Sequence, residues 1–345
     1  MDEDDDSLED ESPEIPFEWR RRAATLLLCD TPLADVITQM TDDGISEELA
    51  AAECARLLLD PALEAGRWAM GQLGKLESVL DAQRQMAELV EPPITVERRK
   101  GLSRKKFLEE YYARNRPVVL EDVCESWPAR RLWSPEYLLD KIGDVEVEVM
   151  TGRSEGNGNE INLDQYRSRM GFDEYATRVA ATEWSNSLYL VANNKLMTEK
   201  AAAPLWKDFT LDRRYMKADR TRNHTFLWFG PGGTVTTLHH DIMNIMFHQL
   251  DGWKHFILVS PLDTHLVGNT IGVFSDVDPL HPDLDRFPRF GEARQLQVTL
   301  GPGDALFVPV GWWHHVTALE TSISLSSTSF VFPNDFDWVH PTLAA

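Results

Sequence analysis

Hydrophobic and polar residues do not alternate between about residues 17 and 90, a stretch that is rich in Ala, Leu, Glu and Arg. Such a pattern is typical of helices rather than strands. Residues that commonly precede a helix stand at Asp30 or Thr31 before Pro32, at Ser46, and at Asp60 before Pro61. The segment EPP at 91–93 ends the pattern, because proline cannot continue a helix. We therefore predict a helical bundle domain over residues 17–93.

The last of these predicted helices carries an apolar stripe. Ala69, Leu73, Leu76 and Leu80 follow one another at spacings of four, three and four residues, so they share one face of a helix. We expect this stripe to pack within the bundle. The alternative is a seam between two copies of the protein, which would make it a homodimer through its helical domain.

Beyond Pro93 the pattern changes to short β-branched or aromatic runs that are bounded by Gly, Pro, Asp and Asn. Such runs predict strands, and they lie at 116–123, 145–150, 187–192, 225–230, 255–261, 305–313 and 322–330. Helical patterns are confined to about 103–114 and 134–141. The predicted fold class of residues 94–345 is therefore an all-β core, an antiparallel sandwich or barrel with flanking helices.

The formal net charge of the protein is −22, part of which lies in the segment DEDDDSLEDE at 2–11. A block of like charges without hydrophobic residues cannot offset the entropy lost on ordering, so we predict a disordered acidic tail over residues 1–16. Attraction to nucleic acid depends on Lys and Arg that neutralise phosphates. We therefore expect no nucleic-acid partner.

Composition indicates a globular protein of the cytoplasm. Of the 345 residues 43% are hydrophobic, enough for a full core. The sequence contains no run of the roughly 18 to 20 apolar residues that a membrane helix needs, and its first residues are acidic rather than a basic leader. We expect no membrane partner. Cys29, Cys54 and Cys124 are odd in number and widely spaced, which argues against a disulfide framework and agrees with a reducing compartment.

The candidate chemistry lies in TTLHHDIMNIMFHQLDGWK, residues 236–254, which otherwise resembles a pair of core strands. Alternate residues of a strand share a face, so His239 and Asp241 point the same way and His240 points the other way. His314 stands at the end of another predicted strand and supplies a third ligand. Two imidazoles and one carboxylate on one face of an octahedral metal leave three positions open, as in non-haem Fe(II) oxygenases.

Lys254 lies on the strand that follows the Asp-Gly turn at 251–252. A lysine buried alone is costly, but it can pair with the distal carboxylate of a bound dicarboxylate. We therefore place Lys254 in the same site as the three metal ligands.

Several motifs resemble one family. WFGPGGTVTTLHHD, QLDGWKHFILVSP, SDVDPLHPDLDRFPRF and GPGDALFVPVGWWHH are similar to segments of the JmjC (cupin-8) branch of Fe(II)- and 2-oxoglutarate-dependent oxygenases, and the likeness spans about 96–335. The resemblance is strongest to the arginyl and asparaginyl protein hydroxylases. It implies a double-stranded β-helix, that is a jelly-roll or cupin barrel, and it implies Fe(II), 2-oxoglutarate and O2 as cofactor and cosubstrates.

The resemblance also implies roles for individual residues. His239, Asp241 and His314 match the iron ligands. Lys254, Thr236 and Tyr189 match residues that hold the C5 carboxylate of 2-oxoglutarate.

The sequence departs from the family pattern at two positions. Where the family usually has a cosubstrate-binding asparagine this protein has Ile245, and Asn244 stands one position earlier. We assign Asn244 to cosubstrate binding, which requires a bulge in the strand. Phe274 occupies the position of a substrate-contacting glutamine in the asparaginyl hydroxylase.

We predict a hydroxylase that acts on a carbon–hydrogen bond in a side chain of a protein or peptide and releases succinate and CO2. An arginine substrate follows if Glu146 or Glu148, in the segment VEVEVM, faces the cavity and binds a guanidinium. The alternative is that both glutamates face solvent on an edge strand. Excess acid would attract a basic peptide. The alternatives are a hydroxylase of a small molecule or natural product, a metal-binding cupin that is not an oxygenase, and a non-enzymatic interaction protein.

Overall fold

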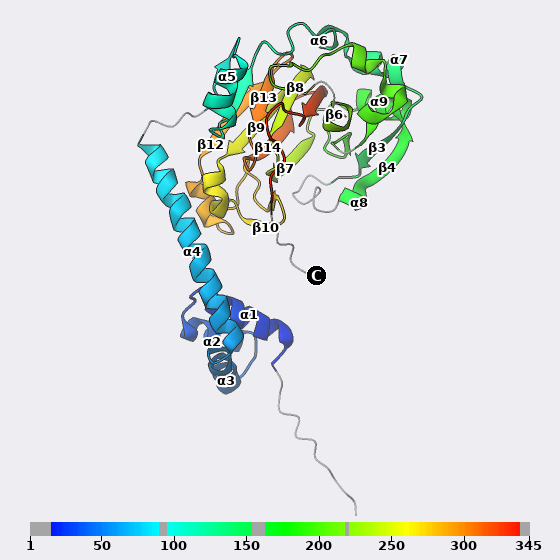
Figure 1. Cartoon of the computed structure of the whole chain (residues 1–345). Coiled ribbons are helices and arrows are strands. Elements are labelled where there is room, and N and C mark those ends of the chain that lie inside the picture. Colours follow the sequence, from blue (N-terminus) through cyan, green and yellow to red (C-terminus); the bar gives the residue numbers. More distant parts are fainter. Residues whose placement is uncertain (1–14, 90–94, 154–162, 193, 218–220, 339–345) are drawn as a thin grey trace, which may run out of the picture. The chain divides into compact units, whose positions relative to one another are not determined.

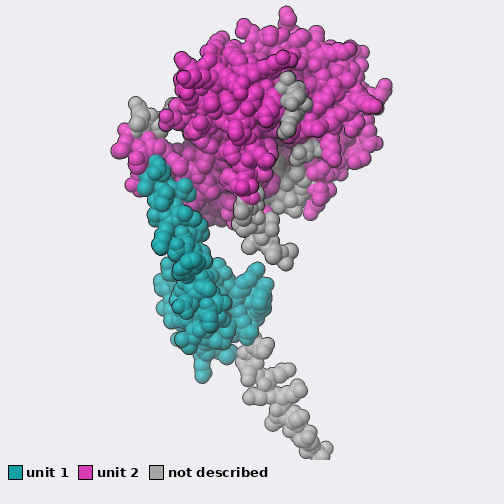
Figure 2. Space-filling view, in the orientation of Figure 1, with its two compact units in different colours: residues 1–83 teal, residues 84–345 magenta. Residues whose placement is uncertain are grey.

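The computed structural model of the protein describes residues 15–89, 95–153, 163–192, 194–217 and 221–338. It divides into two compact units, residues 1–83 and 84–345 (Figure 2). Residues 1–14 of the predicted acidic tail lie outside the described ranges. The units divide within a helix, ten residues before the domain boundary that the sequence suggests after residue 93.

The first unit is helical, with α1 (Phe17–Leu28), α2 (Leu33–Asp42), α3 (Glu47–Leu58) and most of α4 (Pro61–Glu88). Ser46 caps α3, because its hydroxyl accepts a hydrogen bond from the backbone N–H of Leu49. Asp60 receives the N–H of Ala62 in the same way at the start of α4. The prediction that Asp30 or Thr31 caps the second helix is wrong, since α2 begins after Pro32. A small core joins the helices through Ala23, Leu27, Val36, Met40, Ala50, Cys54, Leu57 and Leu63.

The apolar stripe of α4 does not pack within the bundle, contrary to the sequence prediction. Leu73 is 47% exposed and Leu76 is 64% exposed, and the neighbouring Trp68 is 70% exposed. Leu63, at the start of the same helix, is buried. No helix in the described part of the protein is long and apolar enough to cross a membrane.

The second unit is built on two six-stranded sheets (Figure 1). One sheet has the order β1-β2-β13-β8-β15-β6 and the other the order β10-β11-β7-β14-β9-β12. Their bounds are β1 (Arg98–Arg99), β2 (Val118–Leu120), β6 (Thr225–Gly230), β7 (Val235–His239), β8 (Ile245–Asp251), β9 (Lys254–Val259), β10 (Asn269–Ile271), β11 (Phe274–Ser275), β12 (Gln295–Leu300), β13 (Ala305–Val308), β14 (Trp313–Ala318) and β15 (Ser322–Ser327). All pairs are antiparallel except β1 with β2. The cupin-type all-β core predicted from the sequence is confirmed.

Alternation along the strands sorts side chains between the interior and the outer faces. On β9, Phe256 and Leu258 enter an interior core that both sheets share, whereas Val259 faces outward. The interior core contains Val96, Val119, Phe247, Phe256, Leu258, Val298, Leu300, Leu306, Val308, Trp312 and Val316. The outer face of the sheet that contains β8 packs against helices in a larger core, which includes Met246, Leu250, Phe107 and Tyr175.

The remaining elements flank the two large sheets. A three-stranded sheet, β4-β3-β5, consists of β3 (Glu146–Thr151), β4 (Arg167–Gly171) and β5 (Leu188–Tyr189), and α7 and α9 lie beside it (Figure 1). The helices of this unit are α5 (Arg104–Phe107), η1 (Leu108–Tyr112), α6 (Ala129–Leu132), α7 (Pro135–Ile142), α8 (Leu163–Tyr166) and α9 (Phe172–Ala180). Short 3-10 turns are η2 (Leu196–Thr198), η3 (Lys200–Ala202), η4 (Leu205–Lys207), η5 (Arg222–His224), η6 (Pro261–Leu266) and η7 (Pro288–Glu292).

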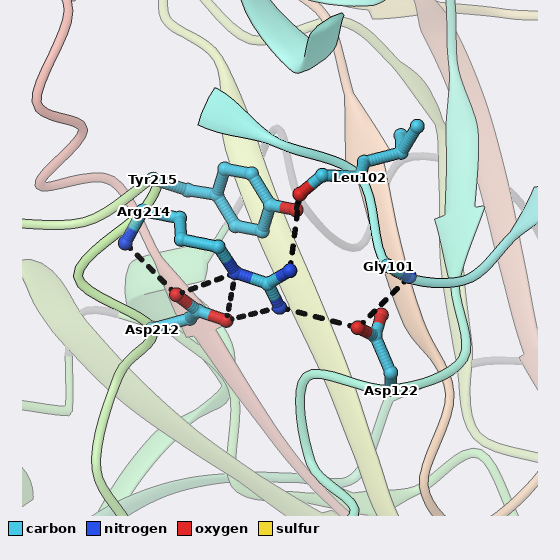
Figure 3. A network of polar contacts seen from close by, with 6 residues as sticks. All are labelled: Gly101, Leu102, Asp122, Asp212, Arg214 and Tyr215. Carbon is cyan, nitrogen blue, oxygen red and sulfur yellow. Dashed lines mark hydrogen bonds and ion pairs between the residues drawn. The ribbon is translucent and has the colours of Figure 1, made fainter. Parts of the chain in front are cut away.

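A polar network around Arg214 fastens distant segments of this unit to one another (Figure 3). The guanidinium contacts both carboxylate oxygens of Asp212, reaches Asp122 Oδ2 at 3.2 Å, and donates to the carbonyl of Leu102 at 3.0 Å. Tyr215 donates to the same carbonyl at 2.6 Å. The network therefore joins the segment before α5, the segment after β2 and the segment before β6 through charge-assisted hydrogen bonds.

Candidate metal centre

The three predicted ligands meet at one point between the two sheets. His239 ends β7, Asp241 follows it in the loop, and His314 is the second residue of β14. The two histidines are directly opposite in the β7–β14 ladder, and their rings are 4.1 Å apart between centroids. One ligand atom from each residue lies within 4.8 Å of the others, and Asp241 Oδ2 is 3.4 Å from His314 Nε2. This donor set fits Fe(II) in the two-histidine, one-carboxylate arrangement.

Backbone carbonyls fix the tautomer of both imidazoles. The Nδ1–H of His239 donates to the carbonyl of Thr237 at 2.8 Å, and that of His314 donates to the carbonyl of Trp312 at 2.9 Å. With Nδ1 engaged in this way, the Nε2 lone pair of each neutral ring is left to bind a metal.

The protonation states also suit a cation. Burial and the nearby His314 lower the pKa of His239 to about 4, so this ring is neutral at pH 7. Burial opposes ionisation of Asp241, but the adjacent His314 and the neighbouring imidazoles outweigh it and lower the pKa of the carboxyl. The centre therefore presents a neutral His239 nitrogen and an anionic Asp241 oxygen to a metal.

The ligands open into a cavity of about 420 Å³ between the sheets. Such a volume lies in the range of roughly 300 to 1,000 Å³ that small-molecule sites occupy. Its described lining includes Tyr189, Val191, Ala192, His224, Trp228, Thr236, Met243, Ile245, Phe247, Phe256, Val273, Phe274, Ser326 and Thr328.

Lys254 lies against this cavity and is only 1% exposed. It pairs with Ala318, four residues beyond His314 along β14, which places it roughly 13 Å along the strand from the metal level. Its ammonium donates to the Tyr189 hydroxyl at 3.0 Å and lies 5.3 to 5.9 Å from the ring centres of Tyr189, Trp228 and Phe247. The separation concerns backbone positions, and a buried cation beside the cavity of the metal ligands can anchor the far carboxylate of a dicarboxylate.

A bulge in β7 brings Thr236 to the same cavity as His239. His314 lies opposite His239 and Val316 lies opposite Thr236. Two residue steps on β14 therefore correspond to three residue steps on β7. The extra residue lets side chains three positions apart face the same side, which strict alternation forbids. The structure thus brings Thr236, Tyr189 and the metal ligands into the lining of one cavity, and their binding of the cosubstrate stays a prediction.

Asn244 does not reach the cavity, which corrects the prediction that it binds the cosubstrate. Its neighbours Met243 and Ile245 line the cavity, whereas the Asn244 side chain is buried on the opposite side against Asn334 and Val310. Phe274 does line the cavity, and its ring stacks at 6.1 Å from that of His239.

Glu146 and Glu148 also lie outside the metal cavity. They line a separate cleft of about 530 Å³ on the three-stranded sheet, where the neighbouring β4 carries Arg167 and Arg169. Glu148 forms an ion pair with Arg167, and Glu146 lies 3.6 Å from Arg169. The prediction that one of these glutamates faces the metal cavity is therefore wrong.

Several cavity residues were not predicted from the sequence. Trp228 on β6 donates through its indole N–H to the Ser326 hydroxyl of β15 at 2.9 Å, and His224 Nδ1 is 3.2 Å from the Thr328 hydroxyl. Ser326 and Thr328 could have been found from the sequence. Hydroxyl residues recur in SISLSSTS, and these two lie two positions apart on the face that lines the cavity.

Comparison with known proteins agrees with this geometry. Residues 104–329 match the model of the cupin-like domain family. The protein is 30% identical to lysine-specific demethylase 8 of Xenopus tropicalis, over 65% of its own length and 50% of that protein. It is 30% identical to lysine-specific demethylase JMJ30 of Arabidopsis thaliana, over 67% of its own length and 54% of that protein. It is 27% identical to human tRNA wybutosine-synthesizing protein 5, over 68% of its own length and 77% of that protein.

The matched region spans about half the length of the two demethylases. The family model, by contrast, covers both large sheets except the short β1, and includes all three metal ligands. Because this match extends over more than half of the 345 residues, the protein belongs to the cupin-like family of JmjC oxygenases, whose enzymes use Fe(II), 2-oxoglutarate and O2.

Proposed function

We propose that the protein is an Fe(II)- and 2-oxoglutarate-dependent hydroxylase that acts on a carbon–hydrogen bond in a side chain of a protein or peptide. The observation that supports this most strongly is that the cavity lined by His239, Asp241 and His314 is also lined by Tyr189, whose hydroxyl accepts a hydrogen bond from the buried Lys254. A metal triad alone would fit other cupins. The buried lysine behind Tyr189 supplies the second requirement, an anchor for a dicarboxylate.

The residues of the protein bind and orient the reactants. Lys254, Tyr189 and Thr236 would hold the C5 carboxylate, and the two Nδ1 hydrogen bonds keep the imidazoles aimed at the metal. Trp228, Phe247 and Phe256 make that end of the cavity apolar and exclude water. The bound metal, 2-oxoglutarate and O2 supply the oxidation, which yields succinate and CO2 and places one oxygen atom in a carbon–hydrogen bond of the substrate.

The described lining favours an uncharged substrate side chain over arginine. The cavity lining includes the apolar Val191, Ala192, Met243, Val273 and Phe274. Asp241, a metal ligand, is the only acidic residue in the described lining. A guanidinium there would lack a carboxylate partner, which is unfavourable for a buried charge.

A tRNA substrate is the second candidate, because relatives that are 27% identical are named tRNA wybutosine-synthesizing protein 5. The net charge of −22 opposes it, since binding a polyanion requires basic residues. The proposal therefore keeps a protein or peptide as the substrate.

The test is 2-oxoglutarate turnover by the purified protein with Fe(II), together with mass spectrometry for a product that has gained one oxygen atom on a peptide library, a tRNA pool and a metabolite mixture. We expect succinate formation and an oxygenated peptide. Single substitutions His239→Ala, Asp241→Ala and His314→Ala should each abolish succinate formation. His255→Gln is the matched control, because His255 lies on the outer face of the same sheet beside Thr299. Full turnover by all three triad variants would refute the assignment, and a product only on tRNA or metabolites would refute the peptide substrate.

A further inference from the structure

The three metal ligands come from a loop as well as from a strand ladder. His239 and His314 face each other within the β7–β14 pairing, but Asp241 lies beyond the last residue of β7. The ladder therefore positions the two imidazoles and leaves the carboxylate to the loop between β7 and β8. The contacts that hold the loop between β7 and β8 in place therefore also determine the position of the Asp241 carboxylate.

Two hydrogen bonds connect this loop to the one that leads into His314. The backbone N–H of Gly311 donates to the carbonyl of Asp241 at 3.0 Å, and the N–H of Val310 donates to Asn244 Oδ1 at 2.9 Å. Asn244 is 2% exposed, so its amide group needs partners within the protein. The side chain that the family pattern would place in the cavity thus connects the two ligand-bearing loops from outside.

Asn334, from the segment after β15, completes the set of partners for Asn244. Its Oδ1 accepts from both the backbone N–H and the Nδ2 of Asn244, each at 2.8 Å. Its Nδ2 donates to the carbonyl of Asn244 at 3.0 Å and to that of Thr328 at 2.8 Å. With its amide nitrogen held by Asn334, the Asn244 oxygen is directed at Val310.

We propose that Asn334 is a positioning residue for the metal centre, and that it acts through Asn244 on the Asp241 loop. This inference rests on the metal site of the proposed function. The C-terminal segment continues along the same loop, since the ring of Trp338 lies 4.9 Å from that of His240. Asn334 itself touches no metal ligand among its described contacts.

Loss of a partner that is hydrogen-bonded directly to a metal ligand typically weakens metal binding by roughly 10- to 100-fold. Because Asn334 lies one residue further from the ligands, we expect Asn334→Ala to raise the Kd for Mn(II) by about tenfold, the lower end of that range, in the full-length protein after removal of metal by a chelator. If Asn334 acts through Asn244, the double variant Asn334→Ala/Asn244→Ala should bind Mn(II) no more weakly than Asn244→Ala alone. The visible absorption of the Co(II)-loaded variant should also shift, because the carboxylate ligand is displaced.

The matched control is Asn194→Ala. The Asn194 amide likewise donates to two backbone carbonyls, those of Val191 and Leu227, but among its described contacts it reaches neither ligand-bearing loop. Its Mn(II) affinity and Co(II) spectrum should equal those of the wild type even if its unfolding midpoint falls as far as that of Asn334→Ala. Should Asn334→Ala fail to fold, Asn334→Ser keeps a hydrogen-bonding side chain and is measured instead.

The outcomes separate this inference from the proposed function. If the wild type binds Mn(II) and Asp241→Ala does not, the metal site is established without any measurement of turnover. With that site established, an Mn(II) affinity of Asn334→Ala within about twofold of the wild type, or additive losses in the double variant, would overturn the role of Asn334. Absence of Mn(II) binding by the wild type would overturn both the metal site and this inference.

Discussion

In the barrel most apolar side chains of the strands are buried, either between the two sheets or between a sheet and the helices that cover it, whereas along α4 a stripe of apolar side chains is exposed to solvent. Leu306 of β13 is 0% exposed, but Leu76 of α4 is 64% exposed. The polar residues show the reverse contrast, because Lys254 and His248 are almost fully buried in the barrel.

This contrast identifies which residues require an explanation in each region. In the barrel an apolar interior is expected, so the informative residues are the buried polar ones. On α4 a polar surface is expected, so the informative residues are the exposed apolar ones. In the barrel the metal ligands and Lys254 depart from the expected apolar interior. In the helical unit the stripe of α4 departs from the expected polar surface.

The largest expected effect tests burial in the barrel. Leu306→Ala removes a side chain that packs between the sheets among Val119, Phe247 and Val308. The cavity left behind should lower the free energy of unfolding by about 2 to 5 kcal/mol. Urea unfolding of the metal-free protein measures it, with the exposed Leu280→Ala as control. A loss no larger than that of the control would show that the interior is not close-packed.

The second expected effect separates function from stability inside the barrel. Lys254→Met replaces a buried ammonium with an apolar group, so it should leave the unfolding free energy unchanged or raise it. It should also weaken 2-oxoglutarate binding, because a charge-assisted contact is lost. Such a contact contributes about 1.5 to 3 kcal/mol, which corresponds to a roughly 10- to 150-fold higher Kd. Calorimetry with Mn(II) in place of Fe(II) measures the affinity, and the exposed Lys207→Met serves as control. Equal affinity of the two variants would remove Lys254 from the site.

The metal ligands could be predicted because residue chemistry and strand alternation point to the same set. His239 and Asp241 are two apart, and His314 stands at the end of the predicted strand 305–313, so no knowledge of strand order was needed. In the structure Asp241 lies in the loop after β7 and His314 is the second residue of β14, yet the three residues still meet. Lys254 was predictable for a related reason, since a lysine in an apolar strand is costly without a role.

Other site features depend on pairings that the sequence does not specify. The bulge that turns Thr236 into the cavity exists only in the ladder with β14. Asn244 was misplaced because its partner Asn334 is 90 residues away in the sequence. Glu146 and Glu148 were misplaced because their arginine partners lie on β4, a strand that the hydrophobic pattern did not predict.

The third expected effect tests the penalty that the barrel imposes on charge. Burial lowers the pKa of His248 to about 4 from its ordinary 6.5, and its ring packs 5.0 Å from Trp127. Because the folded protein holds this ring neutral, its contribution to stability is complete above the ordinary pKa and is lost as the pH falls from 6.5 towards 4.

His248→Gln should therefore flatten the pH dependence of stability. Between about pH 7 and about pH 5 the wild type should lose about 2 kcal/mol more than the variant. Urea unfolding at a series of pH values gives the difference. Parallel pH profiles for the two proteins would show that His248 does not titrate between the folded and unfolded states.

The smallest expected effect concerns the stripe of α4. Leu76→Glu should change the free energy of unfolding by less than about 0.5 kcal/mol, because Leu76 is exposed and both residues favour helix. Leu63→Glu is the contrast within the same helix, since Leu63 is buried in the core of the helical unit and should be strongly destabilising. Light scattering tests whether the stripe joins two copies of the protein. If it does, the wild type has the mass of two copies and Leu76→Glu has the mass of one. A stability loss for Leu76→Glu as large as that for Leu63→Glu, with no change in mass, would show that the stripe is covered within a single copy.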